Sequence, residues 1–379
     1  MTAVTTRWAW ADIDLDAITH NVTVLREIAA PAAVWAVVKA DGYGHGALEV
    51  GSAAMLAGAG GLCVALASEG VALRRAGISA PILVLSEQPP ECAEALVEHH
   101  LTPTVSTAAG IAALARASSS HATEPLDVHL KIDTGMHRVG AAVADATWLC
   151  REVDNHPSLR LAGVFTHLAV ADELAHAETA AQLQRFDAAL AGLRSIEVVH
   201  AANSAGAMAH PESRYSMVRT GIALYGISPG ADLDDVATRL RPALSLKARV
   251  AFVKRLSAGD RVSYGLRHAL PRDANVATVP IGYADGVRRN LSGLGTPVLI
   301  GGKRREIIGT ITMDQLLVDC GDEDVAIGDE VVFIGRQGDE EIRAELWASL
   351  LGTIGYEVVC GIGARVPRHY VRSAAHQAE

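Results

Sequence analysis

The chain has 379 residues, of which half are apolar and 20% are charged, and its formal net charge is −10. This length exceeds what one hydrophobic core usually supports and favours two domains. The negative charge argues against nucleic acid or an anionic membrane surface as the main partner.

The N-terminal segment and the cysteines indicate the compartment. Residues 1–11 lack the apolar core of a signal peptide, and glycines interrupt the charge-free stretch 50–67, which therefore predicts a helix, a glycine stop and a short buried strand. The five cysteines are odd in number and lack CxxC spacing, so they indicate neither a disulfide framework nor a zinc site. We expect a soluble cytoplasmic protein without a metal or a membrane span.

From residue 33 to about 222, short apolar segments alternate with stretches of helical periodicity. The strand candidates are 34–38, 62–66, 82–85, 102–105, 127–132, 161–165, 198–201 and 217–218. Alternation of this kind predicts a parallel sheet, and eight units favour an α/β fold of the (β/α)8 TIM-like barrel type over residues 11–238. An open doubly wound sheet is the alternative.

After a loop at 228–242 that is rich in proline, glycine and aspartate, helical periodicity nearly vanishes. Short β-type segments follow at 247–256, 275–280, 297–300, 306–311, 315–318 and 330–334. They predict a mainly β C-terminal domain over 239–379, with one substantial helix at 344–351. The N-terminal segment looks extended, and residues 1–10 are expected to pair with this domain.

Lys39 ends the first apolar segment and precedes a turn with glycines at 42, 44 and 46. Burial disfavours the charged form of a lysine, and an amine with a lowered pKa can form a Schiff base with a carbonyl. Glycines let the backbone approach a ligand closely. The alternative is a lysine that extends to solvent before an ordinary turn, and spacing alone supports both interpretations equally.

Other polar residues follow the predicted strands. In such a barrel the active site lies at the carboxyl ends of the strands, and phosphate is held after strands seven and eight. The residues at this rim are Lys39, Arg138, His167, Asn203, Ser204 and Arg219. Each alone is compatible with a solvated loop, but their joint placement predicts a functional site.

The segment 203–206 (NSAG) has the form of a helix N-terminus, where a serine hydroxyl and backbone N–H groups can bind an anion. A plain N-cap is the alternative. Gly221 would let a second N–H approach the same phosphate, and the phenols of Tyr43 and Tyr356 would donate to it.

The chain resembles bacterial alanine racemases, which are fold-type III pyridoxal-phosphate enzymes, over nearly its whole length. The matching segments, in order, are AVVKADGYGHG, KIDTGMHRVG, THLAVAD, HAANSAG, VRTGIALYG, VSYG, GYADG, TMDQ and GYEVVCGIGARVPR. The resemblance implies a homodimer with shared active sites that interconverts L- and D-alanine and supplies D-alanine for peptidoglycan.

Position by position, the resemblance implies that Lys39 is the Schiff-base lysine and one catalytic base, and that Tyr264, reaching the partner subunit's barrel, is the other. The implied cofactor-binding residues are Lys39, Tyr43, His167, Asn203, Ser204, Arg219, Gly221, Ile222 and Tyr356. Among them, Arg219 would face the pyridine nitrogen and His167 would support it.

The resemblance also assigns residues to the substrate. Arg138 and, from the partner subunit, the backbone N–H of Met313 would bind its carboxylate. Lys131 matches a position that is carbamylated in several members, and Tyr283 and Asp314 fall where the family narrows the entrance. No metal is implied.

Racemisation needs two bases on opposite faces of the substrate. Bringing the tyrosine pKa from about 10 to near 7 requires roughly 4 kcal/mol, for which a cation such as His167 or Arg138 is the expected source. Arg219 is not expected to protonate the pyridine nitrogen, because an arginine pKa lies above about 12.

The chain departs from common family residues at 41–42, with Asp-Gly for Asn-Ala, and at 287–288, with Val-Arg for an aromatic and a proline. The main alternative is therefore a racemase for serine, lysine or a broad range of amino acids on the same scaffold. A decarboxylase of the related two-domain class and a non-catalytic pyridoxal-phosphate carrier are less favoured.

Overall fold

The computed structural model describes residues 7–121 and 124–372, which form two compact units. One unit comprises Ile18–Arg241, and the other combines the N-terminal segment up to Ala17 with the chain from Pro242 onward. The prediction for residues 1–10 lies partly outside the described residues. We call the two units the barrel unit and the β unit.

Eight parallel strands form the barrel unit's sheet, in the order β10-β2-β3-β4-β5-β6-β8-β9. They are β2 (Ala33–Val37), β3 (Gly61–Val64), β4 (Ile82–Val84), β5 (Thr102–Val105), β6 (Leu126–Asp133), β8 (Leu159–Phe165), β9 (Val198–His200) and β10 (Met217–Thr220). Between β9 and β10, Ser216 N–H donates to Val199 O (3.1 Å) and Arg219 N–H to Ala202 O (3.0 Å). The predicted barrel is confirmed as a nearly closed one, and the open doubly wound alternative is wrong.

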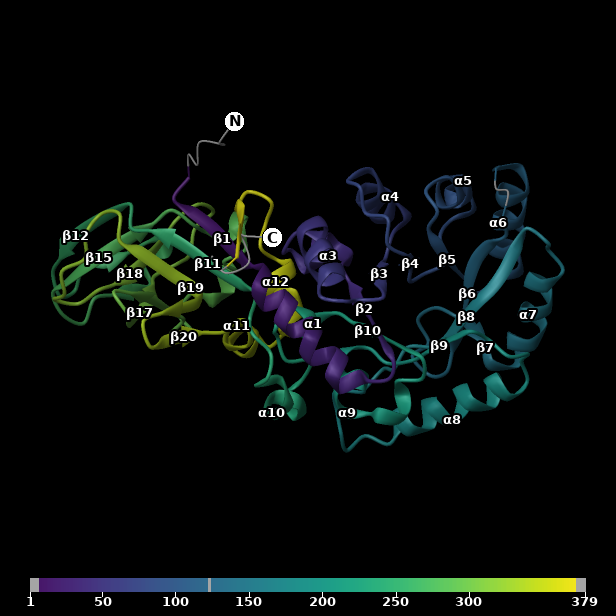
Figure 1. Cartoon of the computed structure of the whole chain (residues 1–379). Coiled ribbons are helices and arrows are strands. Elements are labelled where there is room, and N and C mark those ends of the chain that lie inside the picture. Colours follow the sequence, from purple (N-terminus) through teal and green to yellow (C-terminus); the bar gives the residue numbers. More distant parts are fainter. Residues whose placement is uncertain (1–6, 122–123, 373–379) are drawn as a thin grey trace. The chain divides into compact units, whose positions relative to one another are not determined.

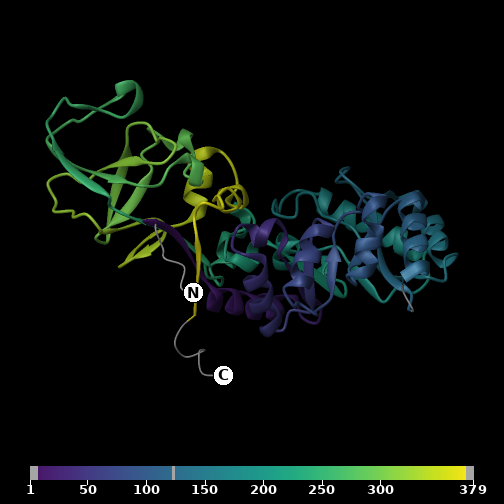
Figure 2. The same ribbon diagram turned by 90° about the horizontal axis from the view of Figure 1, so that it is seen from above.

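Helices alternate with these strands, and those from α3 to α8 lie along the outside of the sheet (Figure 1; Figure 2, purple to teal). The helices are α1 (Leu15–Ala29), α2 (Lys39–Tyr43), α3 (Ala47–Leu56), α4 (Ala67–Arg75), α5 (Ala93–Glu98), α6 (Ala108–His121), α7 (Ala146–Asp154), α8 (Glu178–Ala191), α9 (Ser204–Ala209) and α10 (Asp234–Ala237). A short β7 (Ala141–Ala142) pairs with β6. Because helices cover the sheet, strands such as β3 are buried along their whole length and read as continuous apolar segments.

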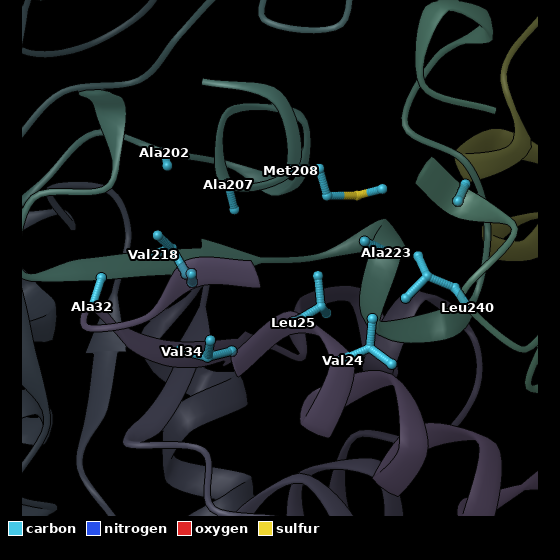
Figure 3. Close-up of a cluster of buried hydrophobic side chains, with 12 residues drawn as sticks. Val24, Leu25, Ala32, Val34, Ala202, Ala207, Met208, Val218, Ala223 and Leu240 are labelled. Atoms are coloured by element: carbon cyan, nitrogen blue, oxygen red, sulfur yellow. The ribbon is translucent and has the colours of Figure 1, made fainter. Parts of the chain in front are cut away.

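An apolar cluster packs α1 against β2 and β10. Figure 3 shows Leu25 of α1, Val34 of β2 and Val218 of β10 together in this cluster, and all three are buried. Ala207 and Met208 of α9 extend the same cluster. These contacts hold β2, which precedes Lys39, and β10, which carries Arg219.

The β unit is one large, mainly antiparallel sheet in the order β12-β15-β18-β17-β16-β19-β11-β1-β21, with β20 paired to β19. Its strands are β1 (Ala9–Asp14), β11 (Leu244–Arg249), β12 (Phe252–Leu256), β15 (Ala274–Val279), β16 (Pro297–Ile300), β17 (Lys303–Ile308), β18 (Leu316–Asp319), β19 (Glu330–Gln337), β20 (Glu340–Ile342) and β21 (Arg368–Val371), beside the hairpin β13 (Arg261–Val262) and β14 (His268–Ala269). Buried and half-buried residues alternate along β1 and β11, as expected for a sheet with one covered face.

The predicted helix at 344–351 is confirmed as α11 (Ala344–Leu351), but three details differ. The predicted strand 247–256 breaks at Val250, because Val250 N–H turns to Asp329 O while Ala251 N–H bonds Thr278 O. The short helix α12 (Gly355–Cys360) and strand β21 were not predicted. In the described part of the chain, no helix is long and apolar enough to cross a membrane.

Candidate active site

Lys39 stands at the start of a left-handed turn. The segment labelled α2 is not a regular helix, because Ala40, Asp41 and Tyr43 all have φ near +50°. The Asp41 carboxylate accepts a hydrogen bond from Ala47 N–H (2.9 Å) and holds the end of the turn. The Lys39 ammonium lies 6.0 Å from the centre of the Tyr43 ring, so one turn carries both the lysine and a phenol.

Tyr43, Gly221 and Ser204 meet at the ends of β9 and β10. A Cβ at Gly221 would lie 2.5 Å from the Tyr43 hydroxyl, so any other residue at this position would force the phenol to shift. Ser204 Oγ accepts hydrogen bonds from Gly221 N–H (2.9 Å) and Ala223 N–H (3.4 Å), and Ile222 lies between them. A hydroxyl, a phenol and closely approached backbone thus form a small polar cradle of the kind that holds phosphate.

Asn203 precedes this cradle as the N-cap of α9. Its Oδ1 accepts from Gly206 N–H (2.9 Å) and its Nδ2 donates to Leu168 O (3.3 Å). The plain N-cap interpretation therefore accounts for both polar atoms of Asn203, and its role is to orient Ser204 at the first turn.

Arg219 is a buried cation that lines the barrel with its guanidinium. Its Nη2 donates to Thr166 O (2.9 Å) and Ala201 O (3.0 Å), and Nη1 lies 2.6 Å from His200 Nδ1. Burial lowers the pKa of Arg219 to about 10, so the group stays charged at neutral pH. A guanidinium with this pKa is a hydrogen-bond donor and a poor acid.

Two buried histidines stand behind this guanidinium. A guanidinium only donates, so His200 Nδ1 accepts from Arg219, and His200 Nε2 carries the proton toward His129 Nδ1, 2.9 Å away. The His200 ring stacks on the Phe165 ring, with 4.6 Å between the ring centres. The Lys131 ammonium lies 5.3 Å from the centre of the Phe165 ring. This stack fixes the direction of Arg219.

His167 follows β8 and accepts on Nδ1 from Arg219 Nη2 (3.3 Å), which leaves its proton on Nε2. Burial and the charges of Arg219 and Lys131 hold the pKa of His167 well below its ordinary value. The prediction that His167 is a cation near the second base is therefore wrong. It is a neutral donor, and Arg138 is left as the expected cation.

Lys131 and Arg138 lie beside His167 and line one small pocket with it. Burial, followed by the charges of Arg219, Arg138 and Lys39, lowers the pKa of Lys131 to about 8. Its ammonium donates to Leu85 O (3.1 Å). With this pKa, Lys131 carries a substantial neutral fraction near pH 8.

The loop that presents Arg138 is shaped by the side chain of Asp133. This carboxylate accepts from Gly135 N–H and His137 N–H, both at 3.0 Å. Gln182 of α8 ties the same loop to the one after β8, because its Nε2 contacts Thr134 Oγ1 (3.3 Å) and its Oε1 accepts from Ala169 N–H (2.8 Å).

In the β unit, Tyr264 stands on a strained turn with its side chain in solvent. The residue is 72% exposed, and its neighbours Ser263 and Leu266 have positive φ. Thr310 Oγ1 donates to Tyr264 O (2.9 Å), which fixes the backbone of the turn. An exposed phenol on a fixed backbone is suited to contact another molecule.

Tyr283 and Met313 lie side by side in the same unit, because Tyr283 N–H donates to Thr312 O (3.0 Å) and Ala284 N–H to Met313 O (3.1 Å). Both side chains are partly exposed. Beneath them, the fully buried Asp285 pairs with Arg7 (2.5 Å) and accepts from Gly282 N–H (3.0 Å).

The remaining predicted positions are also in the β unit. Arg365 contacts Asp285 (3.4 Å) and holds Asp314 through a 2.7 Å ion pair. Tyr356 lies half-buried on α12. Of the departures from the family pattern, Val287 is buried and Arg288 pairs with Glu357 at 3.6 Å.

Several residues that shape the site were not singled out from the sequence: Glu69, His129, Asp133, Gln182, His200 and Asp285. Glu69, His129 and Gln182 act on backbone groups or on another side chain, so nothing in their local pattern marks them, whereas Asp133 lies inside the quoted motif KIDTGMHRVG. His200 and Asp285 lie inside the quoted motifs HAANSAG and GYADG, and a polar residue within an otherwise small and apolar motif is the signal that would have found them.

The chain matches known families over nearly its whole length. A model of the alanine racemase N-terminal domain matches residues 13–229, and one of the alanine racemase C-terminal domain matches 243–370. The alanine racemase of Symbiobacterium thermophilum is 47% identical over 369 residues, covering 96% of this chain and 97% of that protein.

Solved structures agree with this match. The crystal structure of alanine racemase from D-cycloserine-producing Streptomyces lavendulae has a TM-score of 0.92 at 39% identity and covers 99% of this chain and 100% of its own. That of the Bacillus anthracis alanine racemase with bound L-Ala-P has a TM-score of 0.91 at 37% identity, with 98% and 97% covered. This chain therefore belongs to the alanine racemase family.

Proposed function

We propose that this chain is an enzyme that interconverts L- and D-alanine, with pyridoxal 5′-phosphate bound through Lys39. One observation carries the proposal: the turn that presents Lys39 also presents Tyr43, whose hydroxyl lies against Gly221, and the N–H of Gly221 donates to Ser204. An amine and a phenol on one turn, with the phenol beside the cradle, fit a cofactor with an aldehyde at one end and a phosphate at the other.

The residues of the cradle are compatible with a bound phosphate. Gly221 is a position where a Cβ would close the space at Tyr43, so backbone can approach a phosphate there. Ser204 lies on the same side and Asn203 fixes it, while Ile222 and Tyr356 are the further proposed phosphate contacts. When bound, pyridoxal phosphate withdraws electrons from an attached amino acid and so acidifies its Cα–H.

Arg219 would hold the ring nitrogen of the cofactor. Its pKa of about 10 keeps its protons on the guanidinium at neutral pH, and its bonds to Thr166 and Ala201 fix its direction. Arg219 would therefore donate a hydrogen bond without transferring a proton. An arginine at this position would therefore limit electron withdrawal by the cofactor ring. This favours return of the proton to Cα over slower side reactions.

Two bases would move that proton. Lys39 would act on one face of the substrate, and Tyr264 of the partner subunit on the other. Tyr264 is largely exposed on its own chain, which suits a residue that completes another subunit's site. The Nε2–H of His167 would donate to this phenol and stabilise its anion. We accordingly propose a homodimer with shared active sites.

The substrate carboxylate would be bound by Arg138 and by the backbone N–H of Met313 from the partner subunit, with Tyr283 and Asp314 lining the entrance. Lys131 is proposed to be carbamylated. Its neutral amine would attack the carbon of carbon dioxide and release a proton to solvent, and the new carboxylate would balance Arg138. The lowered pKa of Lys131 supports this step.

The product would serve peptidoglycan synthesis, and we propose the cytoplasm as the location, in keeping with an odd number of cysteines that lack CxxC spacing. The test is a chiral assay of the purified protein with pyridoxal phosphate and L-alanine, L-serine or L-lysine in turn. We expect the D-isomer to accumulate fastest from alanine and not to form with Lys39→Ala. Faster conversion of serine or lysine would favour the broad-range alternative, and no conversion would reject the proposal.

A further inference from the structure

The Glu69 carboxylate joins the ends of two neighbouring barrel strands. Its Oε1 accepts from Ala40 N–H (2.7 Å), directly after Lys39. Its Oε2 accepts from Ala65 N–H (2.8 Å) and Leu66 N–H (3.1 Å), just beyond β3. One half-buried side chain on α4 therefore fastens the lysine turn to the rest of the barrel.

The left-handed turn after Lys39 requires stabilisation by its surroundings. Ala40, Asp41 and Tyr43 hold positive φ values, which L-residues adopt only where the surroundings impose them. Within the turn, Gly44 N–H bonds Ala40 O (3.0 Å) and Gly46 N–H bonds Asp41 O (2.8 Å). These bonds close the turn on itself, and the Glu69 contact links its first residue to the neighbouring strand.

We propose that Glu69 is a positioning residue for Lys39: by accepting the Ala40 N–H, it holds the left-handed turn that aims the lysine amine into the barrel mouth. This inference rests on the proposed function for the meaning of Lys39. The contact with Ala40 itself is independent of it.

A purely structural role is the competing explanation. Glu69 is the third residue of α4, where a glutamate commonly accepts the N–H of the N-cap residue, here Leu66. That bond alone would stabilise α4 without affecting Lys39. The bond to Ala40 lies outside this capping box, so the two roles predict different consequences.

The chain offers a matched control in Glu87. Its carboxylate also fastens a corner, after β5, by accepting from Ser106 N–H (2.5 Å) and Thr107 N–H (2.9 Å). None of these donors adjoins Lys39. Glu87→Ala thus removes a comparable set of charged hydrogen bonds from a different corner of the same barrel.

The first measurement uses the protein without added cofactor. Hydrogen exchange at the Ala40 amide and the pH dependence of Lys39 labelling by trinitrobenzenesulfonate are compared by mass spectrometry. For Glu69→Ala we expect Ala40 exchange to rise on the order of tenfold or more, because a bond to a charged acceptor is lost. We also expect a displaced pH midpoint for Lys39 labelling. Glu87→Ala should leave both unchanged.

The second measurement uses the enzyme with pyridoxal phosphate and L-alanine. Glu69→Ala should lower kcat roughly tenfold or more while KM for alanine stays within about twofold, because a misplaced reacting group costs rate before it costs binding. Glu69→Gln keeps one acceptor oxygen and should fall between the wild type and Glu69→Ala. It also serves if Glu69→Ala does not fold.

The two measurements distinguish a positioning role of Glu69 from a purely structural one. If both Glu69 variants match Glu87→Ala in Lys39 labelling and in kcat, Glu69 only caps α4 and the inference is overturned. If the wild type does not racemise alanine but Glu69→Ala still displaces the Lys39 labelling midpoint, the proposed function fails while the positioning role stands.

Discussion

The imidazoles of His129 and His200 lie 2.9 Å apart, from Nδ1 to Nε2, behind the guanidinium of Arg219. The pair has one consistent set of protons, since each ring accepts on Nδ1 and carries hydrogen on Nε2. Gly163 makes room for it, because a Cβ there would lie 2.6 Å from the His129 ring. The tautomer of His200 is therefore set by Arg219 on one side of the ring and His129 on the other.

The first prediction concerns the loss of folding stability at acidic pH. Burial lowers the pKa of His129 to about 4, and burial and nearby cations hold those of His167 and His200 well below 6.5. As the pH falls from 6.5 toward 4, the unfolded chain binds protons that the folded chain does not, so the free energy of unfolding falls. The expected slope is roughly 1.4 kcal/mol per pH unit for each histidine.

Thermal melts or denaturant titrations across this range measure the slope. His129→Gln, whose carbonyl can still accept from His200, should reduce the slope by about one histidine's share. The exposed His176→Gln is the control and should leave it unchanged. An unaltered slope in His129→Gln would contradict the lowered pKa of His129.

The second prediction tests the cradle. Gly221→Ala places a methyl against the Tyr43 hydroxyl and should weaken pyridoxal phosphate binding on the order of tenfold. In a Tyr43→Phe background the same change meets no hydroxyl and should cost less. A double-mutant cycle on cofactor affinity measures this coupling, and strictly additive losses would show that the two groups do not meet.

The third prediction tests the shared site. Lys39→Ala and Tyr264→Phe should each be nearly inactive alone. After mixing and subunit exchange, half of the dimers should be mixed and hold one intact site each, which restores about a quarter of wild-type activity. If exchange is demonstrated and activity does not return, both bases come from one chain.

The fourth prediction concerns Lys131. With ¹³C-labelled bicarbonate, the wild type should show a carbamate carbon signal that Lys131→Arg lacks. The signal should grow as the pH rises toward 8, because the lowered pKa of Lys131 then exposes its neutral amine. A signal that persists in Lys131→Arg would assign the modification elsewhere.

The fifth prediction concerns stability. Asp285 is fully buried between Arg7 and Arg365, so Asp285→Asn should lower the free energy of unfolding by roughly 2 kcal/mol through weakened charged hydrogen bonds. Asp314→Asn, which removes an exposed partner of Arg365, should cost less than about 1 kcal/mol. Equal losses in urea titrations would show that burial does not distinguish the two carboxylates.

The sequence predicted much of the fold because barrel strands are buried on both faces and read as apolar segments. Strands 102–105 and 297–300 match the structure from end to end. The sequence predicted less where a strand ends and the chain pairs with a different strand, as at Val250. Such a break in strand pairing does not change the apolar character of the sequence.

Residues of the site were predictable where they end a strand or sit in a glycine turn, as Lys39, Ser204 and Arg219 do. Glu69 was not, because its partners are backbone N–H groups of other segments. Nor was the pairing of Asp285 with Arg7, 278 residues away in the chain. The charge of His167 was predicted wrongly because burial beside Arg219 cannot be read from local sequence.

The place of β1 in its sheet bears on how the protein is made. This strand is translated before the barrel, whereas its two partners, β11 and β21, are translated only after it. Until then β1 has an unsatisfied edge that invites pairing with other nascent chains. Rapid completion of translation should therefore limit misassembly, and early termination should leave a product prone to aggregate.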